Sequence, residues 1–246
     1  MTPIVEVKNL VARYGENTIL DGISFNVNPG EIFMVIGGSG CGKTTLLQHM
    51  IGLLKPFSGN ILIDGQSISR ACDRERVSIL HKIGVLYQSN ALFGSLNLAK
   101  NVALPLEELT DLPKDAILDI AHDKLKMVGL EGFGDYMPAE VSGGMQKRAA
   151  LARAMALDPK VLFLDEPTSG LDPISSSEIN ELVVNLSNIL GITFIVVTHD
   201  VASICKIAQR VVLLHQKKIV ASGTPMELRK GNHPFVNKFF ESIKEA

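Results

Sequence analysis

A glycine-rich segment at residues 37–44 has the residue types and spacing of a loop that binds phosphate. It reads Gly-Gly-Ser-Gly-Cys-Gly-Lys-Thr and matches the pattern G-x-x-x-x-G-K-[ST]. Glycines let successive backbone N–H groups turn toward a phosphate, and the N-terminus of a following helix adds partial positive charge. Lys43 can place a cation on the outer phosphates, and the Thr44 hydroxyl can ligate Mg²⁺. The segment, together with the adjacent Thr45, predicts a nucleotide site. Its expected residues are Gly37, Gly38, Ser39, Gly40, Cys41, Gly42, Lys43, Thr44 and Thr45.

Two adjacent carboxylates follow an apolar run at residues 161–164. The run predicts a buried strand, and we expect that strand to lie parallel and adjacent to the one before the phosphate loop. An aspartate at such a strand end, here Asp165, can hold Mg²⁺ through water. Glu166 points in a different direction and could take a proton from water that attacks the γ-phosphate. The pair therefore predicts a metal ligand beside a catalytic base.

The elements that must position these residues alternate along the chain. Residues 32–36 are apolar throughout, which predicts a strand covered on both faces, and a helix is expected from about 43 to 54. Before them, apolar and polar residues alternate at 23–27, as in an antiparallel strand. Residues 161–197 predict a β-α-β unit. We expect one α/β domain over 1–246, with a P-loop NTPase core (about 1–89 and 159–246), an N-terminal antiparallel β subdomain and an inserted α-helical subdomain (about 90–158).

Composition excludes several classes of protein. A protein whose main role is to bind the nucleic-acid backbone presents a basic face, and the net charge of -2 argues against that role. We therefore expect no nucleic-acid partner. The sequence has no apolar run of about 18 residues, the length that spans a bilayer. Residues 1–6 carry neither the basic nor the apolar region of a secretory signal. The 3 cysteines are scattered without metal spacing, and reduced thiols of a cytosolic protein are expected.

Four further segments occur in an order that makes the whole pattern specific. They are Val141-Ser142-Gly143-Gly144-Met145-Gln146, Gln88 after an apolar run, Ser169-Gly170-Leu171-Asp172, and His199 at the end of an apolar strand. Together with the phosphate loop, they resemble the ATP-binding cassette (ABC) ATPases over essentially the whole chain. The resemblance implies the α/β fold expected above, ATP and Mg²⁺ as cofactors, and ATP hydrolysis coupled to transport.

The resemblance also implies a site shared between two subunits. Ser142, Gly143 and Gly144 resemble the family signature, which contacts the γ-phosphate of the ATP bound by the opposite subunit. The working unit would then be a homodimer with two ATP molecules in its interface. Val141 stands where Leu is usual and Met145 where Gln is usual, and both are peripheral to the phosphate contacts.

Four residues outside the phosphate loop take roles from the same resemblance. Gln88 resembles the glutamine that touches Mg²⁺ or the lytic water and relays the nucleotide state to a membrane partner. His199 resembles the histidine that contacts the γ-phosphate, and Asp172 an aspartate that communicates across the dimer. Tyr14 resembles the aromatic residue that stacks on adenine. The expected catalytic set is Glu166, His199, Lys43 and Gln88, and the expected metal ligands are Thr44, Gln88 and Asp165.

The segments 86–96 and 101–106 narrow the resemblance to the ATPases of Mla-type lipid transporters. These bacterial systems move phospholipid with an MCE-domain protein. Asn90 stands where Gly is expected and Lys100 where an acid is usual. The resemblance implies an integral-membrane permease dimer, an MCE-domain substrate-binding protein and a small STAS-type accessory subunit as partners. It also implies a peripheral location on the cytoplasmic side of the inner membrane.

Three alternatives remain open at this stage. One is the ATPase of another ABC importer, such as one for polar amino acids or metals. Another is a soluble ABC ATPase of DNA repair or translation, although those carry a second cassette, a long coiled coil or basic arms. The third is a nucleotide-binding regulatory module without turnover, against which the intact Glu166 and His199 argue.

Overall fold

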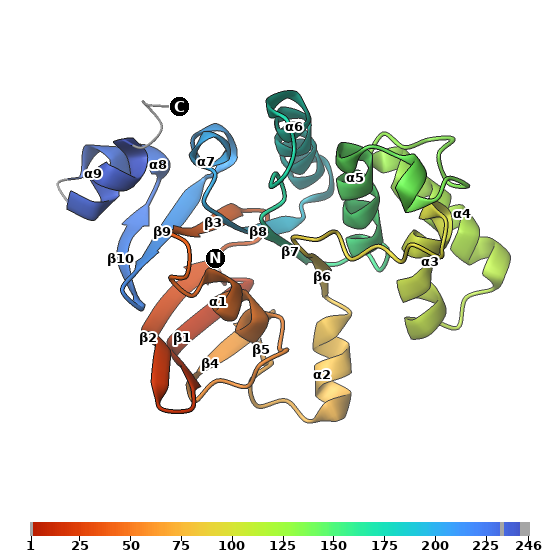
Figure 1. Ribbon diagram of the computed structural model, residues 1–246. Helices are drawn as coiled ribbons and strands as arrows, with labels where there is room; N and C mark the ends of the chain where they lie inside the picture. The colour runs from red at the N-terminus through yellow and green to blue at the C-terminus, as the bar shows by residue number, and fades with distance from the viewer. Residues whose placement is uncertain (1, 232–233, 242–246) are drawn as a thin grey trace.

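The computed structural model describes residues 2–231 and 234–241, and in this part of the chain a six-stranded sheet forms the centre. Its order is β10-β9-β3-β8-β7-β6, and all neighbours are parallel except β10 and β9 (Figure 1). The strands are β3 (Ile32–Gly37), β6 (Ile83–Leu86), β7 (Val161–Asp165), β8 (Thr193–Thr198), β9 (Arg210–His215) and β10 (Lys218–Gly223). The carboxyl ends of the parallel strands therefore meet at one edge, where ligands bind in open α/β sheets.

The position of β7 corrects one expectation from the sequence. The strand that carries Asp165 is parallel to β3 but is not its neighbour, because β8 lies between them. The β-α-β unit of β7, α6 (Pro173–Leu190) and β8 returns the chain toward β3. Asp165 consequently lies at the same edge of the sheet as the phosphate loop but two strands away from it.

A second, antiparallel sheet is formed by the N-terminal part of the chain, with the order β2-β1-β4-β5. Its strands are β1 (Val5–Tyr14), β2 (Asn17–Val27), β4 (Ser58–Ile63) and β5 (Gln66–Ser67). Phe33 and Val35 of β3 belong to one core with this sheet and with α1 (Lys43–Met50). The helix α1 ends four residues before the predicted end at Leu54, because the chain turns at Gly52 with φ +75°.

The opposite face of the central sheet is covered by helices, and Met34 and Ile36 of β3 point into that core. The helices on this side include α6, α7 (Val201–Ile207), α8 (Pro225–Lys230) and α9 (Pro234–Glu241). Burial on both faces explains why the interior positions of β3, β7 and β8 are apolar on both faces, with polar residues only at the strand ends. The phosphate loop is thereby held on a strand fixed from both sides.

A group of helices lies between β6 and β7 in sequence and to one side of both sheets in space (Figure 1). It comprises α3 (Leu98–Leu109), α4 (Lys114–Met127), the 3₁₀ helix η1 (Pro138–Glu140) and α5 (Gly143–Ala154). A further helix, α2 (Asp73–Leu80), precedes β6 and is absent from the sequence prediction. No helix within residues 2–231 and 234–241 combines the length and the apolar character needed to cross a membrane.

Candidate functional site

The phosphate loop joins the end of β3 to the start of α1. Gly37 has φ +154°, and a Cβ atom there would lie 2.5 Å from the carbonyl oxygen of Leu214, so only glycine fits. Gly42 precedes α1 with φ +103°, and no side chain caps that helix. Lys43 Nζ donates to the carbonyl oxygens of Gly37 at 2.8 Å and Gly38 at 3.1 Å. The uncapped N–H groups of α1 and the Lys43 ammonium are donors suited to a phosphate.

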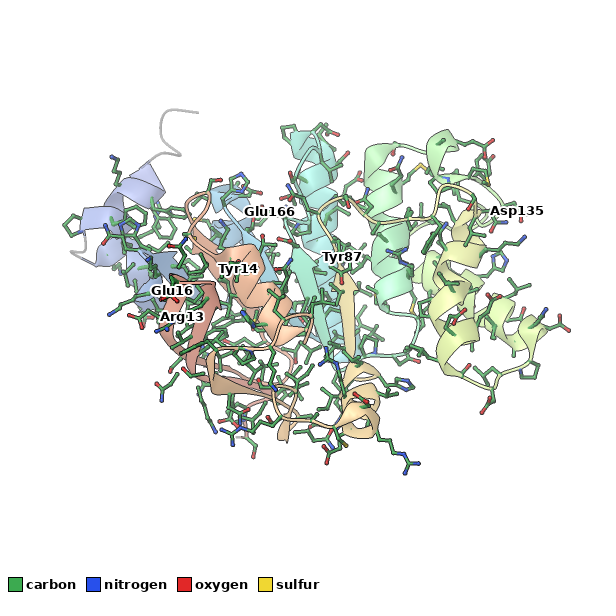
Figure 2. All side chains as sticks on the ribbon, turned by 60° about the horizontal axis from the view of Figure 1, so that its bottom comes forward. Arg13, Tyr14, Glu16, Tyr87, Asp135 and Glu166 are labelled. Atoms are coloured by element: carbon green, nitrogen blue, oxygen red, sulfur yellow. The ribbon has the colours of Figure 1, made fainter. Side chains whose placement is uncertain are left out.

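A cleft of about 660 Å³ beside this loop brings most of the predicted site together. The predicted residues that line it are Tyr14, Gly38, Ser39, Gly40, Gly42, Lys43, Thr44, Thr45, Gln88, Glu166 and His199. Tyr14, labelled in Figure 2 at the end of β1, is 52% exposed and has a ring available for stacking. Gly37 and Cys41 do not line the cleft, and burial raises the pKa of the Cys41 thiol. The volume is in the range of small-molecule sites.

Asp165 ends β7 as a buried carboxylate with unused acceptor capacity. Its Oδ1 atom has no hydrogen-bond partner within the described part of the chain. Burial raises the pKa of Asp165 and the neighbouring Glu166 adds to that rise, while the cations of Lys43 and Lys147 oppose it. A buried carboxylate oxygen without a donor, near a phosphate loop with a threonine hydroxyl, fits a hard cation such as Mg²⁺.

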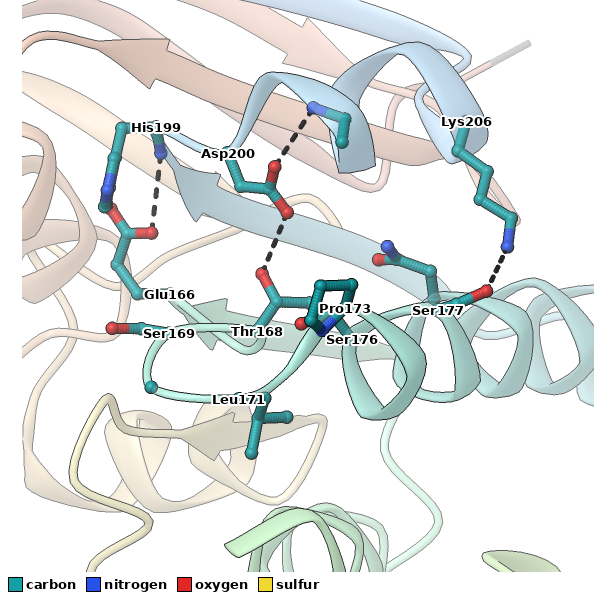
Figure 3. Close-up of a pocket in the computed structure, with 13 residues that line it drawn as sticks. Glu166, Thr168, Ser169, Leu171, Pro173, Ser176, Ser177, His199, Asp200 and Lys206 are labelled. Atoms are coloured by element: carbon teal, nitrogen blue, oxygen red, sulfur yellow. Dashed lines mark hydrogen bonds and ion pairs between the residues drawn. The ribbon is translucent and has the colours of Figure 1, made fainter. Parts of the chain in front are cut away.

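Glu166 is fixed by contacts to the neighbouring strand. Its N–H donates to the carbonyl oxygen of Val197 at 2.8 Å, and its backbone has φ +48°, a region that non-glycine residues enter at some cost. The Thr198 hydroxyl donates to Glu166 Oε2 at 2.9 Å. Glu166 Oε1 lies 2.7 Å from Nδ1 of His199, and Figure 3 shows these two residues next to each other. Glu166 is 8% exposed. Its carboxylate is therefore oriented before any ligand binds.

The pairing of Glu166 with His199 indicates which ring nitrogen of the histidine carries a proton. An ionised carboxylate only accepts hydrogen bonds, so Nδ1 is the nitrogen that carries a proton and Nε2 is left for another partner. The His199 side chain is 65% exposed, in contrast to its nearly buried partner. Glu166 is thus held in place by protein contacts, whereas the His199 ring is open to a ligand.

The same pair separates the cleft from a second cavity of about 460 Å³, since both residues line both spaces. In this second cavity, Thr168 donates to Asp200 Oδ2 at 3.1 Å, and Asp200 caps α7 through the N–H of Ala202 (Figure 3). These contacts fix the turn that follows His199. The sequence prediction missed Thr168 and Asp200, although the spacing of Asp200 before a helix is an N-cap signal.

The signature residues Ser142, Gly143 and Gly144 and the predicted Asp172 do not line this chain's own cleft. Ser142 caps α5, accepting at Oγ from the N–H of Met145 at 3.2 Å. Asp172 caps α6, and its hydrogen bonds from Ser175 and the backbone lower its pKa. A Cβ atom on Gly144 would lie 3.5 Å from Ser175. The structure therefore places the signature beside the start of α6, outside the cleft.

Phe239 of α9 lines the cleft and is another residue that the sequence prediction missed. It joins Tyr14, Ile19 and Val201 as the apolar members of a lining that is otherwise formed by the phosphate loop and polar side chains. No local pattern identifies such a residue, because its place depends on how α9 docks. A flat base needs apolar contact, so these residues are suited to the base end of a nucleotide.

We expect Phe239→Ala to weaken ATP binding about two- to twelvefold, because an aromatic contact contributes about 0.5–1.5 kcal/mol beyond its buried area. Titration of the purified chain with a fluorescent ATP analogue measures this change. Phe235→Ala is the matched control, since Phe235 lies on the same helix but stacks on His215 with 3.6 Å between ring centroids. Equal affinities for both variants would exclude Phe239 from the nucleotide contacts.

A phosphate loop at the carboxyl edge of a parallel sheet, an oriented carboxylate–histidine pair and an inserted helical group with its own glycine-rich helix start define an ABC-type ATPase. The chain belongs to the ABC transporter family, whose pattern it matches over residues 20–169. The predicted fold class, the resemblance to ABC ATPases and the assignment as an ATPase are thereby confirmed.

Curated relatives extend the similarity over nearly the whole chain. The intermembrane phospholipid transport system ATP-binding protein MlaF of Haemophilus influenzae is 43% identical over 243 residues, which are 99% of this chain and 92% of that protein. MlaF of Escherichia coli K12 is 40% identical over 99% of this chain and 90% of its own length. The probable ribonucleotide transport ATP-binding protein mkl of Mycobacterium leprae is 39% identical over 96% of this chain and 68% of that protein. The predicted resemblance to Mla-type ATPases is confirmed.

Two solved structures agree with the assignment to the ABC family. A dimeric post-hydrolysis state of the ATP-binding cassette MJ0796, bound to ADP and Pi, has a TM-score of 0.81 and 32% identity, covering 89% of this chain and 98% of that one. CbiO1 of Clostridium perfringens, part of the ABC transporter complex CbiONQ, has a TM-score of 0.85 and 33% identity, covering 98% of this chain and 99% of that one.

Proposed function

We propose that the chain is the ATP-hydrolysing subunit of a bacterial ABC transporter that moves phospholipid between membranes. The similarity to two MlaF proteins over 99% of the chain supports the phospholipid substrate. The observation that carries the enzymatic part is Glu166, held between Thr198 and His199 at one side of the cleft that contains the phosphate loop. This arrangement supports ATP turnover rather than ATP binding alone.

In this proposal the chain's own residues bind the triphosphate and activate the water that attacks the γ-phosphate. Lys43 and the N–H groups at the start of α1 bind the phosphates, and Tyr14 stacks on the base. Glu166 takes the proton of the attacking water, and His199 donates to a γ-phosphate oxygen from Nε2 when its ring carries a second proton there. Thr44, Asp165 and Gln88 are the proposed ligands of Mg²⁺, which would supply positive charge against the phosphates.

A second copy of the chain is proposed to complete each site. Ser142 and Gly143 are exposed at the start of α5, where backbone N–H groups suit a phosphate, yet they lie outside the chain's own cleft. The similar MJ0796 cassette is a dimer in its post-hydrolysis state with ADP and Pi. Asp172 and the second cavity beside the Glu166–His199 pair would then lie at the interface between the copies.

An apolar groove of about 390 Å³ supports a membrane permease as a further partner. It runs between β6, the segment after Gln88, α3 and the end of α5, and it includes the exposed rings of Tyr87 and Phe93. Tyr87 is labelled in Figure 2. Exposed apolar surface of this kind marks interaction sites. The chain would then be peripheral, on the cytoplasmic side of the inner membrane, with an MCE-domain protein and a STAS-type subunit as further proposed partners.

Phe93→Asp is expected to reduce co-purification of the permease about tenfold or more, because a charge placed in an apolar interface core removes a central contact. Phe93 is 52% exposed, whereas its neighbour Leu92 packs against the core and Leu98 is buried, so Phe93 alone is the suitable position. Phe57→Asp is the matched control: Phe57 is 64% exposed and lies outside the groove. Equal co-purification of both variants would contradict the groove as the permease site.

The substrate is tested by deleting the protein and measuring phospholipid in the outer leaflet of the outer membrane. Accumulation there, together with detergent sensitivity that the wild-type gene reverses and the Phe93→Asp gene does not, is the expected result. A normal barrier and co-purification of a permease for a small polar solute would leave the ATPase assignment intact and remove the phospholipid assignment. A nucleotide substrate, as the name of the mycobacterial relative suggests for that protein, would be one such outcome.

A further inference from the structure

Lys147 is a buried lysine in α5 whose ammonium group has a defined partner. The residue is 3% exposed, and Nζ donates to the backbone carbonyl oxygen of Gln88 at 2.6 Å. Burial lowers the pKa of Lys147, against the opposing effect of the Asp165 and Glu166 carboxylates. Burying an ammonium group is costly unless it is paired, so the contact with Gln88 has to offset that cost.

A second cation of α5 contacts the same loop. Arg153 donates to the carbonyl oxygens of Ala91 at 2.7 Å and of Asn90 at 2.9 Å. Asn90 and Ala91 have φ values of +62° and +51°, a left-handed region that non-glycine residues enter at some cost, and the contacts from Arg153 help to offset that cost. Lys147 and Arg153 are about 9 Å apart along the helix axis, at about 1.5 Å per residue. The loop of residues 88–91 is therefore attached to α5 at two separate points.

In the proposed dimer, the two ends of this connection serve different ATP molecules: the start of α5 serves the partner's, and Gln88 serves the chain's own. Ser142, which starts α5, is less than two helical turns from Lys147 and lies outside the chain's own cleft. Gln88 lines that cleft together with Lys43 and Glu166. A displacement of α5 consequently moves Gln88 relative to the Glu166 carboxylate, provided that the contact between Lys147 and Gln88 is kept.

We propose that Lys147 is a positioning residue that fixes Gln88 to the signature helix, so that engagement of Ser142–Gly144 by a partner's nucleotide places Gln88 in this chain's own site. The proposal rests on the ATPase dimer of the proposed function. Lys147 does not itself line the cleft, so its role is to position Gln88 for turnover and not to bind ATP.

The test is Lys147→Met, which keeps an unbranched side chain and removes the donor. We expect kcat for ATP hydrolysis to fall about tenfold with KM changed less than about twofold, since an interaction needed only for the chemical step is lost. Lys147→Arg should recover most of the rate. Lys124→Met is the matched control, because Lys124 is also buried on a helix of the same group but pairs with Asp158, away from the cleft.

All variants are compared as full chains by melting temperature, fluorescent ATP binding and phosphate release, with Lys147→Ala as a second variant in case Lys147→Met unfolds. The proposal is supported if Lys147→Met keeps the wild-type melting temperature and ATP affinity but has a low kcat, and if Lys147→Arg recovers most of that kcat. Wild-type kcat in either folded variant, an equal loss in Lys124→Met, or a rate loss that only follows lowered melting overturns it. Absence of turnover in the wild-type chain would instead contradict the proposed ATPase function.

Discussion

Glu166→Gln is expected to lower kcat for ATP hydrolysis by about 10²–10⁴-fold, the range that a positioned general base contributes. The amide has nearly the same shape as the carboxylate and can still accept the Thr198 hydrogen bond at Oε. It cannot take a proton from water. Because the phosphate loop is unchanged, ATP should bind with near-normal affinity, and the ATP-bound dimer should accumulate.

Phosphate release and size-exclusion chromatography with ATP measure the two parts of this expectation. Glu181→Gln is the matched control, because Glu181 is an exposed carboxylate on α6 that pairs with Lys206 at 2.9 Å, away from the cleft. Its turnover should stay near that of the wild type. Near-normal turnover in Glu166→Gln would remove Glu166 from the role of base.

The phosphate loop could be predicted because a short stretch of sequence specifies it. The phosphate loop follows from the spacing of Gly37, Gly42 and Lys43 between a strand and a helix. The strand order did not follow, since an apolar run such as residues 161–164 is buried on both faces wherever it lies in the sheet. The expected neighbour relation of β7 and β3 was therefore wrong, and β8 separates them.

Contacts between distant segments account for what the sequence could not provide. Glu166 and His199 were identified separately, but their 2.7 Å pairing depends on how β7 and β8 lie side by side. Lys147 stands in a helix that the sequence shows only as rich in Arg and Ala, and its link to Gln88 spans 59 residues. Phe239 reaches the cleft only through the docking of α9, where Val236 and Phe240 are buried.

Ser142→Arg is expected to abolish ATP hydrolysis and to leave ATP binding by the isolated subunit intact. Ser142 is exposed at the start of α5 and does not line the chain's own cleft, so a bulky cation there leaves the phosphate loop undisturbed. In the proposed dimer the same position faces the partner's nucleotide, where the arginine side chain would prevent the two subunits from closing. Fluorescent ATP binding by the monomer and phosphate release by the dimer measure the two effects separately.

The substitution also removes a helix cap, and this second effect needs its own control. Ser142 Oγ accepts from the Met145 N–H at 3.2 Å, and losing such a cap costs about 0.5–2 kcal/mol. Ser142→Ala loses the same hydrogen bond without adding bulk or charge, so it should lower the melting temperature as much as Ser142→Arg does and still allow closure. If Ser142→Ala and Ser142→Arg lose hydrolysis equally, the loss of the Ser142 hydroxyl, and not the bulk or charge of the arginine, explains the effect. If Ser142→Arg loses ATP binding as a monomer while Ser142→Ala keeps it, Ser142 belongs to the chain's own nucleotide site, and the division of the site between two copies is wrong.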